Sequence, residues 1–425
     1  MKDRELYTQL LGLHSPWVVV GVELDSVKQE VLVRVNYDAS EGLLSCAHCG
    51  SCGSVYDYRE ERRWRHLDSC GFTTWLVARV PRVSCSKCGV QTAEVPWSAP
   101  HSRFTLGFEC FALSVLQACG VQSKAAALLR LSKGQVHDVM ERAVQRGLQR
   151  RAQAPRSTLP FLSLDEKSIQ AGHNYLTVLG DTQGGCVLDV AEGRTKEAAG
   201  TLLKGALSES QRATVRAVSM DMWKGFAGAC HEVLPQAQIV HDRFHITQYL
   251  NRAVDITRRC EHRRLTRQSK AGKSAEKAAD SPLNKTKYVW LKNEDNLTDK
   301  QRLTLQALRE GDLETVKVWS FKEAFRAFFA CADEKQGAAF FEQWCQDALA
   351  LGNAALNHVV RLLQAHREGL LAYLRFGITN GGAEGINSRI QQIKFNARGF
   401  RKPGNFRIAI LFFLAKLDLY PQKTQ

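Results

Sequence analysis

Two pairs of cysteines, each with the spacing Cys-x-x-Cys, constrain the N-terminal part of this chain more than any other feature. The first pair is Cys46 and Cys49 in "CAHC", and the second is Cys85 and Cys88 in "CSKC". A glycine follows each pair, as in a tight turn that directs two sulfur atoms at one ion. Four thiolates complete a tetrahedral zinc site without a free coordination position. The spacing therefore predicts a structural zinc site, not a catalytic one.

The segment 50–84 between the two pairs is longer than the usual spacing in zinc ribbons. The stretch "TTWLVARVPRVSC" predicts a strand that leads into the second pair, so a small β-rich finger fits the pattern. A β-hairpin is also predicted at 17–35. Cys52 and Cys70 are further thiols that could replace one ligand. The alternative interpretation is two pairs of buried or redox-active cysteines.

The composition favours a nucleic-acid partner inside the cell. The chain of 425 residues has a net charge of +15, which predicts a polyanionic partner. No basic amphipathic segment supports a membrane surface as that partner. No apolar run approaches the roughly 20 residues that span a bilayer, and "MKDRELYTQLLGL" lacks the features of a secretory signal. We therefore expect a cytoplasmic protein in which the 13 cysteines are metal ligands or buried thiols.

A helix-turn-helix motif is predicted within "GVQSKAAALLRLSKGQVHDVMERAVQRGL", residues 120–148. Ser132 and Gln135 form an S-x-x-Q capping box, which marks the start of the second helix. Two short helices joined by a brief turn are typical of a DNA-reading unit, although an ordinary helical hairpin has a similar pattern. The side chains expected to contact DNA are Lys133, Gln135, His137 and Arg142.

The central segment alternates between strand and helix patterns, which predicts an α/β fold. The predicted elements are strands at 159–165, 173–181 and 186–193, a helix at 195–209, a strand at 215–221, a helix at "KGFAGACHEVL" and a strand at 237–242. A long basic helix is predicted to begin near Phe244, and residues 268–282 are predicted to form an exposed loop. The pattern from 286 to 375 is helical, and its aromatic stripe predicts an ordinary helical core.

Two aspartates are predicted at the ends of apolar strands. Asp165 ends the first strand and opens "DEKS", and Asp221 ends the fourth strand and opens "DMWKGF". A strand that ends in this way places its acid at the rim of a cleft, where α/β sheets hold their ligands. The simpler interpretation is a solvated side chain, since the chain has 43 acidic residues.

A third acid, Glu384, lies at the front of a predicted helix in "ITNGGAEGINSRI". Ile386, Ile390 and Ile393 recur at helical spacing and mark the buried side of this helix, whereas Glu384 falls on the opposite side. Thr379 or Asn380 is expected to cap the helix.

The neighbourhood of Glu384 is strongly basic, since no acid occurs from Ile386 to Arg407. Glu384 must therefore pair with an arginine or help to hold another cation. Three carboxylates brought together by the fold would repel one another unless cations neutralised them. Two divalent ions about 3.5–4 Å apart would do so, and would activate water and polarise a phosphodiester. Because oxygen ligands favour Mg²⁺ or Mn²⁺, we expect Asp165, Asp221 and Glu384 to bind one of these metals.

At this point the chain resembles bacterial insertion-sequence transposases of the ISL-three group. The resemblance covers nearly the whole chain and rests on "CAHC…CSKC", "SLDEKSI", "GHNYLTVLGD", "VSMDMWKGF", "IVHDRFHI", "AVDITRRCE" and "ITNGGAEGINSRIQQIKFNARGF". It implies a ribonuclease-H-like catalytic core with an Asp-Asp-Glu triad, and by position Asp165, Asp221 and Glu384 match the three acids. Asp242 and His245 in "HDRFH" are second-tier candidates, and Asp242 is the rival of Asp221.

The resemblance also implies a domain order in which recognition modules precede the catalytic core. The expected domains are a β-hairpin and zinc finger at 1–95, a helix-turn-helix domain at 96–157, a ribonuclease-H-like core at 158–265 and 376–415, and a helical insertion at 266–375. Further DNA contacts are expected from Arg389, Lys394, Arg398, Arg401 and Lys402.

The expected function is a bacterial DNA transposase that binds the terminal inverted repeats of its own element. It would cleave and transfer DNA strands in a metal-dependent reaction, as a homodimer or larger assembly on DNA at the nucleoid. One alternative is a catalytically silent, transposase-derived protein that binds DNA by sequence. A ribonuclease-H-like nuclease without strand transfer is another, but it leaves the two N-terminal recognition modules unexplained.

Overall fold

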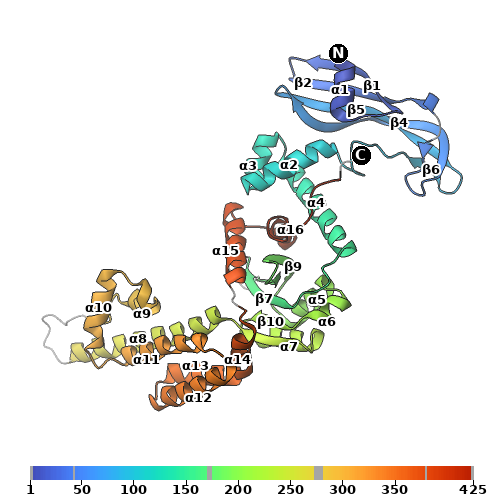
Figure 1. Cartoon of the computed structure of the whole chain (residues 1–425). Coiled ribbons are helices and arrows are strands. Elements are labelled where there is room, and N and C mark those ends of the chain that lie inside the picture. Colours follow the sequence, from blue (N-terminus) through green and yellow to red (C-terminus); the bar gives the residue numbers. More distant parts are fainter. Residues whose placement is uncertain (1–2, 42–43, 170–174, 272–280, 379–380, 423–425) are drawn as a thin grey trace. The chain divides into compact units, whose positions relative to one another are not determined.

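The computed structural model describes residues 3–41, 44–169, 175–271, 281–378 and 381–422. The chain divides into two compact units (Figure 1). Unit 1 consists of Met1–Ala154 with Leu417–Gln425, and unit 2 consists of Pro155–Lys416. No helix in the described ranges is long and apolar enough to cross a membrane.

The N-terminal part of unit 1 is a twisted sheet with strand order β1-β2-β5-β4-β3, in which β6 pairs with β5. Its elements are α1 (Asp3–Leu11), β1 (Trp17–Asp25), β2 (Glu30–Tyr37), β3 (Leu44–Ser45), β4 (Cys52–Ser69), β5 (Phe72–Cys85) and β6 (Gly89–Thr92). The hairpin predicted at 17–35 is confirmed as β1 and β2. Trp97 makes edge contacts with Trp17 and Trp64, and these rings form part of a buried core.

Three helices complete unit 1: α2 (Leu106–Cys119), α3 (Gln122–Leu129) and α4 (Lys133–Gln153). Thr105 caps the start of α2 by accepting a hydrogen bond from the backbone of Phe108. The C-terminal tail belongs to the same unit, since Arg146 donates a hydrogen bond of 2.7 Å to the carbonyl oxygen of Leu419. Helices and tail therefore share one body with the cysteine-bearing sheet.

Unit 2 contains a second sheet with strand order β11-β10-β7-β8-β9. Its strands are β7 (Phe161–Ser168), β8 (Tyr175–Asp181), β9 (Cys186–Glu192), β10 (Ala217–Met220) and β11 (Gln238–His241). The first three strands form an antiparallel meander, and β10 and β11 run parallel to β7. This order of three strands, helix, strand, helix and strand confirms the mixed α/β arrangement expected for the core.

The two largest differences from the predicted elements in this region concern one strand and one helix. The strand predicted to end at Asp165 continues to Ser168, because β8 pairs with β7 in an antiparallel ladder over that whole length. The helix predicted at 195–209 is split into α5 (Lys196–Ala206) and α6 (Glu209–Thr214), because Ser208 forms a capping box that starts a new helix. The following helix is α7 (Lys224–Val233).

The rest of unit 2 is helical. Its elements are α8 (Arg243–Ala271), α9 (Lys287–Leu291), α10 (Asp299–Arg309), α11 (Glu314–Ala324), α12 (Glu334–Ala350), α13 (Ala354–Ala365), α14 (Arg367–Phe376), α15 (Gly381–Asn396) and α16 (Pro403–Leu414). The aromatic stripe is core, as predicted, since Trp290, Trp319 and Phe325 are fully buried. Helix α8 runs without interruption across residue 265, where the catalytic core was expected to end. Most of the loop predicted at 268–282 lies outside the described residues.

Candidate active site and metal centre

The register of the unit 2 sheet places three aspartates at one level: Asp165 within β7, and Asp221 and Asp242 one residue past the ends of β10 and β11. Phe161 of β7 pairs with Ala217 of β10, which in turn pairs with Gln238 of β11. Asp165, Asp221 and Asp242 each lie four residues beyond one of these paired residues. Parallel pairing between β7 and β10 stops before this level, so the acids lie at the carboxyl edge of the parallel strands. This is the edge at which α/β sheets hold ligands.

Asp165 is held by groups from its own strand and from α15. Its Oδ2 atom accepts a hydrogen bond from Nδ2 of Asn387 and lies 3.6 Å from Nζ of Lys167. Its Oδ1 atom accepts a hydrogen bond of 2.7 Å from the backbone of Glu166. The Asp165 side chain remains 19% exposed. The start of α15 is therefore beside the edge of the sheet.

Asp221 and Asp242 have different surroundings, although they are neighbours. The side chain of Asp221 is 28% exposed, whereas that of Asp242 is 5% exposed. Asp242 accepts a hydrogen bond of 2.9 Å from the backbone of Phe244, so it caps the first turn of α8. His245 lies 3.9 Å from Asp221 and 4.0 Å from Asp242, distances that allow electrostatic attraction but no direct hydrogen bond.

A second layer of groups, which the sequence pattern did not reveal, surrounds this edge. Burial raises the pKa of Glu166, and the negative charges of Asp165 and Asp221 raise it further, while Arg194 lowers it. Nε of Arg194 lies 2.9 Å from Glu166, and its guanidinium lies 4.5 Å from the ring centroid of Trp223. Negative charge is therefore concentrated at this edge. Glu166 could have been noticed from its place beside Asp165, but nothing in the local sequence indicates Arg194.

Glu384 lies in α15, three residues before Asn387, and its side chain lies outside the described residues. The capping role predicted for Thr379 or Asn380 also lies outside them. The predicted buried stripe of this helix is confirmed at Ile386, which is 8% exposed, and Ile390, which is 0% exposed, whereas Ile393 is half-buried.

The basic residues after Glu384 fall into two groups, those that hydrogen-bond to the protein backbone and those that are exposed to solvent. Arg389 donates a hydrogen bond to the carbonyl oxygen of Phe413, and Lys394 donates one of 3.0 Å to that of Ser168. Three more lie exposed between α15 and α16: Arg398, Arg401 and Lys402.

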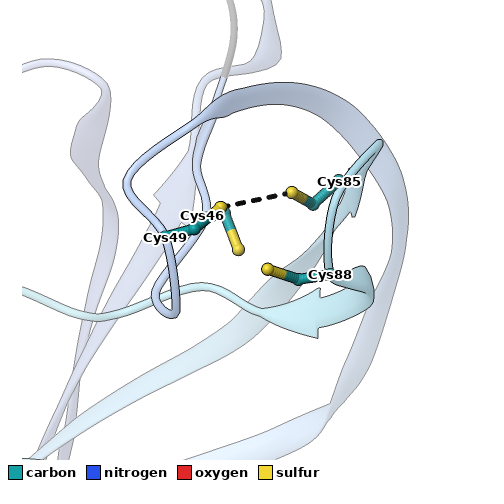
Figure 2. A group of neighbouring side chains, drawn as sticks. All are labelled: Cys46, Cys49, Cys85 and Cys88. Carbon is teal, nitrogen blue, oxygen red and sulfur yellow. Dashed lines mark hydrogen bonds between the residues drawn. The ribbon is translucent and has the colours of Figure 1, made fainter.

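The four cysteines of the two pairs form a cluster in unit 1 that could hold a metal ion. Figure 2 shows their side chains gathered from two separate turns. Their sulfur atoms all lie within 4.8 Å of one another, and in the described part of the chain this is the one such group of His, Cys, Asp or Glu. The glycines that follow the pairs, Gly50 and Gly89, have φ angles of 70° and 71°, as predicted for tight turns. Cys52 and Cys70 are exposed and do not belong to the group.

The protonation of these thiols is uneven. Hydrogen bonds from Ser51 lower the pKa of Cys49 to about 6. A hydrogen bond to the Cys49 sulfur raises the pKa of Cys88 to about 12, because its proton is shared with that thiolate. Cys49 and Cys85 sulfur atoms are 3.5 Å apart. Such close thiols suit a cation that replaces their protons.

The predicted capping box at the start of α4 is confirmed. Gln135 donates its backbone N–H to Oγ of Ser132 at 3.2 Å, and Ser132 donates its own N–H to Oε1 of Gln135 at 2.9 Å. Arg130 ends α3 in a left-handed conformation, so the two helices are joined by a short turn.

The side chains predicted to read DNA from α4 fall into two groups. Lys133 is exposed, and Gln135 and His137 are half-buried. Arg142 instead pairs with the buried carboxylate of Glu109 at 2.7 Å.

Comparison with known proteins shows which family the chain is similar to. Residues 162–410 match the model of an ISL3 family described as "Transposase". Residues 44–88 match the model described as "zinc-finger of transposase IS204/IS1001/IS1096/IS1165". The first match spans the sheet with its aspartates and α15, and the second spans the four cysteines.

Two groups of curated relatives align with almost the whole chain. The chain is 27% identical over 424 residues to the "Transposase for insertion sequence element IS1557" of two Mycobacterium tuberculosis strains, covering 95% of this chain and 94% of that protein. It is 27% identical over 418 residues to the "Transposase for insertion sequence element IS1001" of Bordetella parapertussis, covering 96% and 98%. The chain therefore belongs to the ISL3 family of transposases, as its sequence motifs predicted.

Proposed function

We propose that this protein is a metal-dependent DNA transposase that cleaves and transfers strands at the terminal inverted repeats of its own insertion sequence. The observation that supports it best is the edge of the unit 2 sheet, where Asp165 and Asp221 lie at one level. Asn387 of α15 is hydrogen-bonded to Asp165 there. Because positions 384 and 387 are three residues apart in a helix, they share a face, and α15 can supply Glu384 as the third acid.

The donor set of this edge suits magnesium or manganese. Asp165, Asp221 and Glu384 offer carboxylate oxygens, which are the ligands that these hard cations prefer. The raised pKa of Glu166 reflects burial together with the nearby charges of Asp165 and Asp221, and a bound cation would relieve that repulsion. Bound there, a pair of divalent ions would activate the attacking hydroxyl and stabilise the leaving oxygen of a phosphodiester.

The surrounding residues position this acid set. Asn387 and Lys167 both contact the Oδ2 atom of Asp165. Nδ1 of His245 lies 3.9 Å from Oδ1 of Asp221. Asp242 is the weaker candidate for the second acid, because it is buried and its oxygen already caps α8. We therefore assign Asp221 to the triad and a structural role to Asp242.

Unit 1 would recognise the DNA ends. The Cys46, Cys49, Cys85 and Cys88 sulfurs would hold a structural Zn²⁺ with no free coordination position. The start of α4 would supply base contacts from Lys133 and Gln135, in the manner of a helix-turn-helix. Pairing two DNA ends implies at least a dimer on DNA.

The experiment that tests this function is a strand-transfer assay. Purified protein is incubated with Mg²⁺, a labelled duplex that carries the inverted repeat flanking its gene, and a supercoiled target plasmid. The proposal predicts labelled DNA joined covalently to the plasmid. Cleaved but unjoined repeat DNA would favour the nuclease alternative, and binding without cleavage would favour the silent DNA-binding alternative.

A further inference from the structure

Unit 1 contains a basic groove that the helix pair alone does not account for. A cavity of about 690 Å³ lies between β4 and the start of α4, and it is lined by residues of β4, β5, the loop before α2 and the α3–α4 turn. We propose that this groove binds the sugar–phosphate backbone of duplex DNA beside the bases that α4 reads. The inference rests on the proposed action on DNA and deepens it by naming the surface that holds the duplex.

Three exposed arginines supply the positive charge of the groove. Arg62 and Arg63 come from β4, and Arg103 comes from the loop before α2. Backbone hydrogen bonds hold that loop along β4, since Arg65 donates to the carbonyl oxygen of Arg103 at 2.9 Å and Thr105 donates to that of Arg65 at 3.0 Å. Charges from two separate segments are thus held side by side by the fold.

The floor of the groove is formed by a buried arginine, Arg65, whose charge is already paired. Arg65 is 2% exposed, pairs with Asp68, and places its guanidinium 5.0 Å from the ring centroid of Phe108. It also donates a hydrogen bond of 2.6 Å to the carbonyl oxygen of His66. Arg65 therefore supports the strand that carries Arg62 and Arg63, and it does not add a free charge.

The acids closest to the groove along the chain are mostly paired elsewhere. Glu61, the neighbour of Arg62, pairs with Arg34 at 2.8 Å. Within the described part of the chain, none of the three groove arginines has a carboxylate at salt-bridge distance. Asp138 is the exposed acid on the rim, where a smaller cavity of about 300 Å³ continues past Arg103. The charge of the groove is therefore available to an external anion.

Duplex DNA fits this groove better than a single strand. Proteins that bind single strands stack bases on exposed aromatic rings. Here the ring of Phe104 is 4% exposed, and the half-buried ring of Trp75 has the guanidinium of Arg65 6.0 Å from its centroid. A groove that offers guanidinium groups but no aromatic ring for a base to stack on is suited to phosphates. Gln135 lines the same groove from α4, where a recognition helix contacts base edges while flanking residues hold the backbone.

The test measures DNA binding by the full-length protein over a series of salt concentrations. The probe is a fluorescent duplex of the inverted repeat that flanks the gene, compared with a scrambled duplex and with one strand of the repeat. The variants are Arg103→Gln and a triple change of Arg62, Arg63 and Arg103 to Gln. The matched control is Arg79→Gln, because Arg79 is exposed on the same hairpin but lines neither cavity.

A plot of log affinity against log salt concentration has a negative slope, and each lost phosphate contact reduces the magnitude of that slope by about 0.9. We expect Arg103→Gln to reduce the magnitude of the slope by about 0.9, and the triple variant to reduce it by about 2.7. Both duplexes should be weakened equally. Arg79→Gln should leave the slope unchanged. An unchanged slope in the triple variant, an equal effect of Arg79→Gln, or tighter binding to the single strand would overturn the inference. If the triple variant had an unchanged slope but still carried out strand transfer, the groove assignment would fail while the proposed function stood. A wild-type protein that bound neither duplex would reject both the groove assignment and the proposed function.

Discussion

Asn387 of α15 donates a hydrogen bond to Asp165 of β7, although the two residues are 222 positions apart in the sequence. This contact brings the helix that carries Glu384 to the edge of the sheet where Asp221 lies at the level of Asp165. A shared metal site requires that arrangement, because Asp165 and Asp221 come from the sheet, whereas Glu384 comes from α15, which follows the helices α8 to α14 in the chain.

Substitution of Asn387 tests whether the contact matters for catalysis. A hydrogen bond to a charged group contributes about 1.5–3 kcal/mol. We therefore expect Asn387→Ala to slow cleavage of terminal-repeat DNA about 10- to 100-fold and to raise the Mg²⁺ concentration needed for half-maximal rate. Ser388→Ala is the control, since Ser388 is exposed on the same helix. Wild-type cleavage and Mg²⁺ dependence in Asn387→Ala would remove the positioning role.

Zinc content tests the cysteine group. Cys85→Ser should lose the bound zinc and unfold the local finger, because metal binding supplies folding free energy at such sites. Cys52→Ser should keep one zinc per chain, because Cys52 lies outside the group. Metal analysis of the purified proteins gives the result. Equal zinc in wild type and Cys85→Ser would contradict the assignment.

The structural role of Asp242 predicts a difference between two substitutions. Asp242→Ala removes the cap of α8 and should lower the free energy of unfolding by about 1 kcal/mol. Asp242→Asn keeps a capping oxygen and should stay close to wild type in both stability and cleavage. Denaturant unfolding and a cleavage assay measure the two effects. A stable but inactive Asp242→Asn would show that the second acid of the triad is Asp242.

The burial of His241 predicts a loss of stability in acid. Burial lowers the pKa of His241 to about 4, and the nearby His366 adds to the effect. The unfolded chain takes up this proton near pH 6.5, so the stabilisation is full above that pH and is lost as the pH falls towards 4. As the pH falls from 7 to 5, protonation of His241 in the unfolded chain should lower the free energy of unfolding by about 2 kcal/mol. His241→Leu should lose correspondingly less stability over this range, and an equal loss in both proteins would contradict the prediction.

Features encoded by short-range spacing could be predicted from the sequence. The cysteine group follows from two Cys-x-x-Cys pairs with trailing glycines, and Gly50 and Gly89 have the positive φ that this requires. The capping box of α4 and the buried stripe of α15 are also local patterns. Each of these patterns, including each cysteine pair taken singly, lies within one or two turns of chain. The meeting of the two pairs, whose members Cys49 and Cys85 are 36 positions apart, follows from the four ligands that a tetrahedral zinc ion needs.

Features that depend on long-range pairing could not be predicted. The sequence predicts an end of β7 that is too early, because the pairing of β7 with β8 leaves no signal in the strand itself. The common level of Asp165 and Asp221 is set by a parallel register that no turn specifies. The groove of unit 1 likewise forms only because the loop carrying Arg103 pairs with β4. These relationships join segments far apart in the chain.

The most direct test of the catalytic proposal is Mg²⁺-dependent nicking of labelled terminal-repeat DNA by Glu384→Gln. This change keeps the shape of the side chain but removes the charge that would hold a metal ion. We predict normal folding and DNA binding with no nicking, as also for Asp165→Asn and Asp221→Asn. Near-normal nicking by Glu384→Gln would contradict the account and leave Glu384 as the partner of an arginine.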